Sequence, residues 1–135
     1  MANALYGLGR QGFLDGDIDW AANDIKCVLV DTAAYTVSID VHQFLSDVPG
    51  GARIATSANF TTKTSTLGVA DADDVTFGSV TGAESEALII YYDSGVEGNS
   101  PLLAYIDTAT GLPVTPNGGD ITVTWDSGAD KIFKL

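Results

Sequence analysis

The chain has 135 residues, of which 45% are hydrophobic, and its 18 acidic and six basic side chains give a formal net charge of −12. This length suits one domain with one core, because a domain of ~150 residues buries roughly 70% of its unfolded surface. The charge would repel a phosphate backbone, so we expect no nucleic-acid partner. The single cysteine excludes an intrachain disulfide. No apolar run approaches the ~18 residues that span a bilayer, and no start typical of a secretory signal is present, so we expect neither a membrane partner nor classical secretion.

A short helical segment or arm is predicted over residues 1–16, ahead of a β core over residues 17–135 of the same single domain. The helix itself is expected over residues 3–14, with Asn3 as its N-cap and Gly16 as its stop. Such a helix would be only marginally stable alone. We therefore predict that it docks on its own sheet or on a neighbouring subunit.

Glycines inside this segment weaken its helix propensity, so its order should come from the packing of Leu5, Leu8 and Phe13. With Arg10, these three are the candidate interface residues. The glycines also match the G-x-G-x-x-G spacing of dinucleotide-binding folds over residues 7–12. That motif needs a strand before it and a full helix after it, and this segment is too short for both, so we interpret the match as accidental and expect no cofactor.

An acidic loop follows the helical segment and resembles the opening of a calcium loop, with Asp15, Asp17 and Asp19 at alternate positions. The pattern then breaks, because Trp20 stands where a calcium loop has glycine and Lys26 where it has a bidentate glutamate. A second acidic cluster has even less pattern, and its members are Asp71, Asp73 and Asp74. We interpret both as solvated turns, at most weak cation sites, and predict no metal centre.

The rest of the chain alternates short apolar runs with turn residues, which predicts an all-β fold, mostly antiparallel, as a sandwich or barrel with a jelly roll as one form. The runs at residues 87–92 and 102–107 should pair as a hairpin with a long loop. In the first strand, the side chains of Ile25, Cys27 and Leu29 should share one face. The predicted strands are residues 24–31, 52–56, 59–66, 74–80, 87–92, 102–107 and 121–125, with a last short strand in the tail.

Candidate catalytic residues are absent from the sequence pattern. The one histidine, His42, falls in a short turn over residues 40–47, and Cys27 falls inside a strand, where a cysteine behaves as a small buried hydrophobe. No nucleophile elbow, P-loop or metal-ligand spacing accompanies them. We therefore predict that the protein is not an enzyme.

Two parts of the chain carry a family resemblance. They are residues 1–7 with Gly9-Arg10 and Phe13–Trp20 at the start, and Ala104–Val123 with Lys131–Leu135 at the end. Over nearly its full length the chain resembles small virion structural proteins of tailed bacteriophages. The resemblance implies a capsid decoration (cement) protein on the capsid surface, assembled in the host cytoplasm, with the major capsid protein as its partner and a homotrimer as its form. It brings no catalytic residues.

Other roles stay open. One is a tail, neck or head-fibre component, and another is a host-surface or glycan-binding module, for which exposed Tyr91, Tyr92 and Tyr105 would serve. A small hydrolase is the third, and the missing catalytic constellation argues against it.

Overall fold

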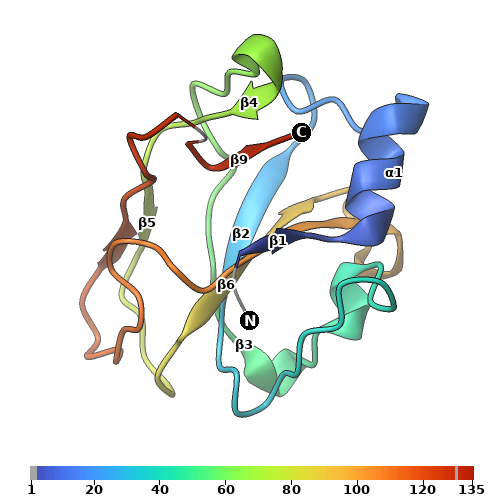
Figure 1. Ribbon diagram of the computed structural model, residues 1–135. Coiled ribbons are helices and arrows are strands. Elements are labelled where there is room, and N and C mark those ends of the chain that lie inside the picture. Colours follow the sequence, from blue (N-terminus) through green and yellow to red (C-terminus); the bar gives the residue numbers. More distant parts are fainter. Residues whose placement is uncertain (1–2, 130) are drawn as a thin grey trace.

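The computed structural model describes residues 3–129 and 131–135, and it confirms a mostly antiparallel β fold with one short α-helix (Figure 1). Met1 and Ala2 of the predicted N-terminal segment, and Asp130 of the tail, lie outside these residues. The centre is an open five-stranded sheet in the order β1-β7-β6-β2-β3. Its strands are β1 (Ala4–Leu5), β2 (Ile25–Val30), β3 (Arg53–Thr56), β6 (Ala87–Tyr92) and β7 (Leu102–Ile106). Since β1 and β3 form two separate edges, this sheet is not closed into a barrel.

Two small antiparallel pairs complete the β structure. They are β4 (Val69–Ala70) with β9 (Phe133–Lys134), and β5 (Val75–Phe77) with β8 (Ile121–Val123). Apolar side chains of both pairs belong to the same core cluster as one face of the central sheet, so together they form an incomplete second layer. The predicted strands at 74–80, at 121–125 and in the tail are confirmed in shortened form.

The predicted hairpin is confirmed as the centre of the fold. β6 pairs antiparallel with β7, with Ile89 opposite Tyr105 and Ile90 opposite Ala104, and β2 pairs antiparallel with the other side of β6. All three strands are apolar almost throughout, as expected for strands that are covered on both faces of the sheet. The predicted alternation is also confirmed, since Ile25, Cys27 and Leu29 lie in one core cluster and Val28 and Val30 in the other.

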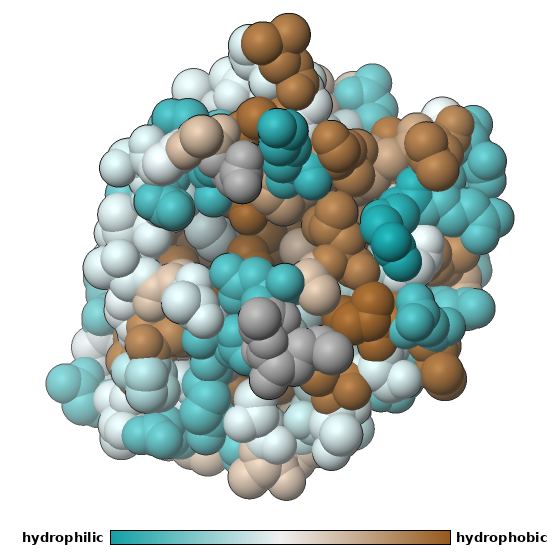
Figure 2. Space-filling view, in the orientation of Figure 1, coloured by the Kyte–Doolittle hydropathy of each residue, from teal (hydrophilic) through white to brown (hydrophobic). Residues whose placement is uncertain are grey.

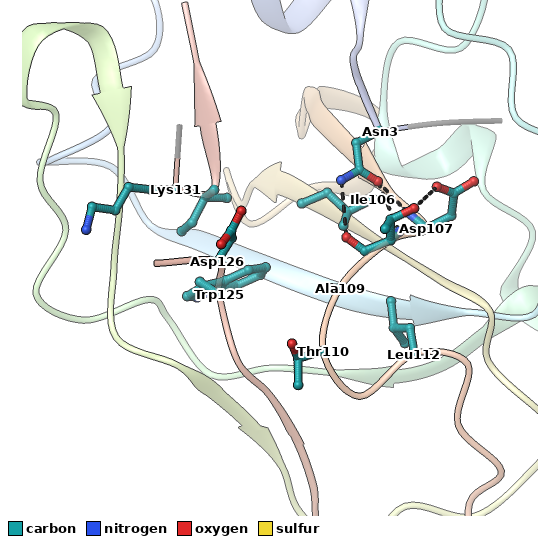
Figure 3. Close-up of a pocket in the computed structure, with 11 residues that line it drawn as sticks. Asn3, Ile106, Asp107, Ala109, Thr110, Leu112, Trp125, Asp126 and Lys131 are labelled. Atoms are coloured by element: carbon teal, nitrogen blue, oxygen red, sulfur yellow. Dashed lines mark hydrogen bonds between the residues drawn. The ribbon is translucent and has the colours of Figure 1, made fainter. Parts of the chain in front are cut away.

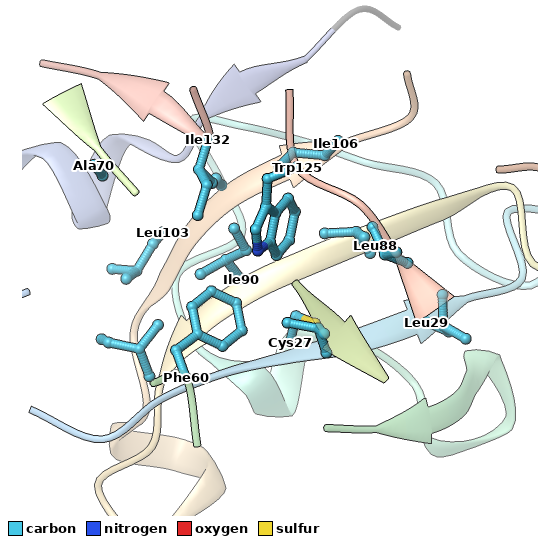
Figure 4. Close-up of a cluster of buried hydrophobic side chains, with 14 of the residues drawn as sticks. Cys27, Leu29, Phe60, Ala70, Leu88, Ile90, Leu103, Ile106, Trp125 and Ile132 are labelled. Carbon is cyan, nitrogen blue, oxygen red and sulfur yellow. The ribbon is translucent and has the colours of Figure 1, made fainter. Parts of the chain in front are cut away.

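One face of the sheet, here called the aromatic face, is covered by aromatic rings from three separate segments. Figure 4 shows two of these rings, Phe60 and Trp125. The ring of Phe60 lies between the others, with its centroid 5.9 Å from that of Trp20 and 5.6 Å from that of Trp125. These rings pack over Cys27 and Ile90, which are fully buried. Contacts of this kind stabilise by apolar burial and ring geometry. The Nε1–H groups of Trp20 and Trp125 in addition donate to the carbonyl oxygens of Asp71 and Asp73, 3.3 and 3.0 Å away.

The opposite face, here called the tied face, is covered by residues 31–52. This segment contains only two turns of 3-10 helix, Leu45–Asp47 and Gly50–Ala52. Hydrogen bonds between side chains hold it: the Tyr6 and Tyr35 hydroxyls lie 2.9 Å apart, and the Tyr35 hydroxyl lies 2.9 Å from Nδ1 of His42. His42 is partly exposed in a turn, as predicted, but sequence reasoning missed this chain of contacts.

Arg53 ties the same segment to the sheet. Its guanidinium donates to the carbonyl oxygens of Val48 at 2.9 Å and Leu45 at 2.8 Å, and it pairs with the Glu97 carboxylate at 2.6 Å. One side chain thus adds donors to two carbonyls of an irregular segment, which also meets the central hairpin through an isolated β-bridge between Phe44 and Pro101.

The helix α1 (Gly7–Asp15) begins later than predicted, and Asn3 does not cap it. The Asn3 carboxamide oxygen instead accepts hydrogen bonds from the backbone N–H groups of Asp107 and Thr108, 2.9 and 3.1 Å away. Asn3 thereby holds the chain beside β7, so the next two residues join the sheet as β1 rather than the helix. The predicted end is confirmed, because Gly16 closes the helix in the left-handed conformation with φ 79°.

The glycines of α1 form its buried side, which the sequence reasoning did not foresee. A Cβ at Gly9 would lie 2.6 Å from the carbonyl oxygen of Leu102, and a Cβ at Gly12 would lie 2.4 Å from Cδ1 of Ile18. The helix therefore docks on β7 by close backbone approach. The same glycines lie inside the helix rather than in a loop before it, so the dinucleotide-binding geometry is not formed.

The predicted strand over residues 59–66 is wrong. Its only ladder contact is a single bridge between Thr64 and Asp71. Thr62 has φ 55°, and the hydroxyls of Thr61 and Thr62 donate to one carboxylate oxygen of Asp73 at 3.2 and 2.8 Å. Hydroxyl bonds to a neighbouring loop, with Phe60 anchored in the core, replace the strand ladder that the threonines favour by propensity.

Candidate interaction surface

Large apolar side chains are exposed at five positions in the described part of the chain. One of these lines a hollow at one corner of the molecule, and two more adjoin its lining residues in sequence. Leu14 is 87% exposed, Leu67 93% and Leu135 57%. They come from α1, from the 3-10 turn Thr66–Gly68 and from the residue after β9. Between these elements is a hollow of about 350 Å³, lined by Phe13, Gly16, Ile18, Asp19, Trp20, Ser65, Gly68, Ala70, Phe133 and Leu135. We call the three leucines and this hollow the leucine corner.

The floor of the leucine corner is built from packed rings. The Phe133 centroid lies 5.9 Å from that of Phe13 and 5.3 Å from that of Trp20. The backbone N–H of Leu135 donates to the carbonyl oxygen of Gly68 at 2.9 Å, which fixes the chain after β9 against the turn. Figure 2 shows hydrophobic side chains gathered along the top of this view, over α1, the turn before β4 and the end of β9. The surface is therefore preformed.

Leu67 has a strained backbone. Its φ of 53° and ψ of 36° are left-handed, a conformation that costs an L-residue with a side chain ~1–2 kcal/mol. Burial does not offset this cost, because the side chain is 93% exposed. The turn thus holds an apolar side chain away from the body of the protein, and strain of this kind is concentrated at functional sites.

The acidic residues near the leucine corner divide between two hollows. Only Asp19 lines this hollow, whereas Asp15 and Asp17 line a second hollow of about 260 Å³. Among the described residues none of these three carboxylates forms a salt bridge, although Asp19 accepts the N–H groups of Ala21 and Ala22 at 3.0 and 3.1 Å. Lys134, the residue before Leu135, is also exposed.

The two acidic clusters of the sequence have structural contacts in the described residues, where no three histidine, cysteine or acidic side chains gather around one point. Asp73 accepts the threonine hydroxyls of the 59–66 segment. Asp74 accepts the backbone N–H of Trp125 at 3.0 Å, and Asp71 lies 3.9 Å from the Lys131 amine.

The four candidate interface residues do not share one surface. Phe13 lines the leucine corner, whereas Leu8 lies on the other flank of α1, in a hollow of about 260 Å³. Leu5 lies on β1 beside a third hollow. Arg10 is exposed and its guanidinium lies 3.7 Å from the Asp40 carboxylate. Only Phe13 therefore belongs to the leucine corner.

Another hollow, of about 440 Å³, lies between the end of β7 and the segment that follows β8 (Figure 3). It is lined by Asn3, Ile106, Asp107, Thr108, Ala109, Thr110, Leu112, Trp125, Asp126, Lys131 and Ile132. The amide of Asn3 is engaged with the backbone of Asp107 and Thr108, and the Lys131 amine faces Asp71. The Thr108 hydroxyl donates to the Asp107 carboxylate at 3.2 Å.

The three tyrosines that were predicted to be exposed are not, and for Tyr91 and Tyr105 that prediction is wrong. Tyr91 and Tyr105 are each 4% exposed, and Tyr92 is half-buried. The first two point into the tied face, because their strands are covered on both sides. Burial raises the pKa of Tyr91 to about 12 and raises that of Tyr105.

The leucine corner was not predicted from the sequence. Leu14 falls within the predicted helix, Leu135 in the tail with its predicted short strand, and Leu67 between the predicted strands 59–66 and 74–80. The available signal was weak: a leucine beside Asp15, and a leucine within a run of serine and threonine.

No protein-family model matches the chain, and a search of curated proteins finds no match to it. In the part of the chain that the structure describes, the helices are too short to cross a membrane.

Proposed function

We propose that this protein is a non-enzymatic structural component of a tailed-phage particle, which binds the outer surface of the capsid as a decoration protein and stabilises the head. The observation that carries the proposal is the leucine corner, because a preformed apolar surface with three protruding leucines gains free energy when another protein covers it. The resemblance to small virion structural proteins supports the same role.

The partner in this proposal is the major capsid protein, and the protein binds as a homotrimer at three-fold positions. Full burial of one leucine is worth ~1.5–3 kcal/mol, and association costs several times that amount. One leucine corner alone would therefore bind weakly. A trimer presents three, and linked contacts raise the overall affinity without any new contact.

The test is to add the purified protein to heads assembled without it and to measure how much sediments with them. Decoration predicts saturable binding with hundreds of copies on each head, and heads that withstand heating better when coated. Saturation at a dozen copies or fewer, or no binding, would contradict the proposal.

A second candidate is a tail, neck or head-fibre component. The leucine corner favours it equally, since any protein neighbour could cover that surface. Copy number in the intact particle separates the two, because tail and neck proteins occur in small numbers. The glycan-binding role loses the exposed tyrosines that motivated it.

A further inference from the structure

We propose that Asn117 is a site of spontaneous covalent modification, where the side chain forms a cyclic imide with the backbone of Gly118 and opens to aspartate or isoaspartate at a rate that the fold controls. The inference is independent of the proposed function. Among the five asparagines of the chain, Asn117 alone is followed by glycine. Because glycine has no side chain, its backbone nitrogen is the least hindered nucleophile that an asparagine can have beside it.

The reaction needs only this chain, base and water. The Gly118 nitrogen loses its proton to base and attacks Cγ of Asn117, so a new N–C bond forms, the C–N bond of the carboxamide breaks and ammonia leaves. Water then adds to one of the two imide carbonyls and opens the ring, which gives aspartate or isoaspartate. Asn117 and Gly118 are exposed, and a Cβ at Gly118 would meet no atom within 4 Å, so base and water can reach the reacting atoms.

The turn that contains this pair needs both residues for its geometry. Gly118 has φ 87°, in the left-handed region that a residue with a side chain rarely adopts. Oδ1 of Asn117 accepts the backbone N–H of Gly119 at 3.0 Å, which closes the turn as asparagine side chains commonly do. The residues that form the turn are therefore also the reactive pair.

In the closed turn the nucleophile is occupied. The Gly118 N–H donates to the carbonyl oxygen of Val80 at 2.7 Å. A nitrogen that attacks Cγ of Asn117 must first give up this hydrogen bond and then its proton. The reaction therefore proceeds from the opened turn, and its rate is proportional to the fraction of molecules in which Gly118 has left Val80.

Two further hydrogen bonds hold the turn closed. The Val80 N–H donates to the carbonyl oxygen of Gly119 at 3.0 Å, and the Ser79 N–H donates to Oδ1 of Asp120 at 2.9 Å. They continue the β5–β8 pair beyond its ladder, so the turn opens when this end of the small pair separates. Isoaspartate adds one carbon atom to the main chain and would shift Gly119 away from its place opposite Val80.

The first test compares the folded full chain with the same chain unfolded in guanidinium chloride, both at mildly alkaline pH. Peptide mass spectrometry follows conversion at each asparagine, and enzymatic methylation of isoaspartate identifies that product. Asn117 should convert first in the unfolded chain, and about tenfold or more slowly in the folded chain. Equal rates at Asn117 in the two states, or faster conversion of another asparagine in the unfolded chain, would overturn the proposal.

Amide hydrogen exchange measures the same opening independently. Both exchange of the Gly118 amide and imide formation require Gly118 to leave Val80. The ratio of the unfolded to the folded conversion rate should therefore match the protection factor of the Gly118 amide measured by NMR. A protected Gly118 amide in a folded chain that converts as fast as the unfolded one would overturn the proposal.

The variant Asp120→Ala tests whether these contacts set the rate. It removes the acceptor of the Ser79 N–H and leaves the reactive pair in place, so conversion in the folded chain should rise about two- to tenfold, the shift expected from loss of one hydrogen bond. Asp126→Ala is the matched control, because it removes a carboxylate that accepts the Gly128 N–H in another exposed turn, and it should convert at the wild-type rate.

Circular dichroism establishes that both variants are folded before their rates are compared. An unchanged rate in Asp120→Ala, or an equal rise in both variants, would overturn the proposal. If Asp120→Ala does not fold, the comparison of conversion with amide exchange in the wild type decides it.

Discussion

The two faces of the central sheet are covered by different means, although the strands present aliphatic side chains to both. The aromatic face is covered by rings and by two small β pairs. The tied face is covered by residues 31–52, which have little regular structure and depend on Tyr35, His42 and Arg53 for contacts. Where the cover pairs its own backbone, ring packing dominates and the two tryptophan Nε1–H groups add hydrogen bonds to backbone carbonyls. Where the cover has little regular structure, side-chain donors and acceptors satisfy part of its backbone hydrogen-bonding groups.

The largest expected effect is on the aromatic face. Phe60→Ala removes the ring that contacts both Trp20 and Trp125, and truncation of a buried phenylalanine costs ~3–5 kcal/mol of unfolding free energy. Urea denaturation followed by circular dichroism measures it. Thr76→Ala, at an exposed position of β5, is the control. A loss no larger than that of the control would show that the ring cover does not stabilise this face.

Loss of the Arg53 guanidinium should destabilise the tied face. Arg53→Met keeps much of the side-chain length but removes the donors to Leu45 and Val48, and hydrogen bonds to a charged group are worth ~1.5–3 kcal/mol. Hydrogen exchange should speed up in residues 45–52 more than in β6. Glu97→Gln is the control and should change stability less, since its carboxylate is exposed. If Arg53→Met costs more than Phe60→Ala, the contrast between the two faces is wrong.

A smaller loss is expected from the buried hydroxyls. Tyr35→Phe removes both the contact with Tyr6 and the contact with His42, and should cost about 1–2 kcal/mol, because the Tyr6 hydroxyl is left buried without that partner. Chemical denaturation measures it, and the hydrogen-bonded His42 ring should show an NMR shift change. Equal stability of Tyr35→Phe and the wild type would mean that residues 31–52 are held by apolar packing after all.

The smallest expected effect is a loss of stability at acidic pH. Backbone N–H groups of Gln43 and Phe44, 2.7 and 3.0 Å from Oδ2 of Asp47, lower the pKa of that carboxyl. A lowered pKa in the folded state contributes stability above the ordinary carboxyl pKa of ~3.9, and this stability is lost as the pH falls through the folded value. Because Asp47 is exposed, solvent screening keeps the contribution small.

The check is NMR of the 43–48 turn on acidification below about pH 4. The turn should loosen before β6 does, and Asp47→Asn, which keeps an oxygen acceptor, should reduce this acid sensitivity. Simultaneous loosening of both regions in the wild type would show that the two faces open as one unit.

The central strands were predictable because their signal is local. The run Ala87–Tyr92 is a strand from end to end, and alternation in β2 assigned Cys27 and Val28 to opposite faces. Local propensity failed at residues 59–66, where threonines bond to Asp73 instead of forming a ladder.

Other features depend on residues far apart in the sequence. Asn3 has the composition of a helix cap, yet its partners Asp107 and Thr108 lie about a hundred positions away, so no local pattern could place it. By helix propensity alone, the glycines of α1 should destabilise the helix. Their role is visible only in the folded structure, where β7 approaches Gly9 too closely for a side chain. The leucine corner joins three segments in the same way, so its members could not be grouped beforehand.

The position of Cys27 makes it a built-in reporter of opening. The thiol is fully buried in β2, between β3 and β6 in the sheet, and burial raises its pKa to about 12. At mildly alkaline pH the folded protein therefore holds almost no accessible thiolate, and a thiol reagent can react only after β2 has left the core. The rate of thiol modification under native conditions then measures how often β2 opens. No label needs to be added, and no second cysteine contributes to the signal.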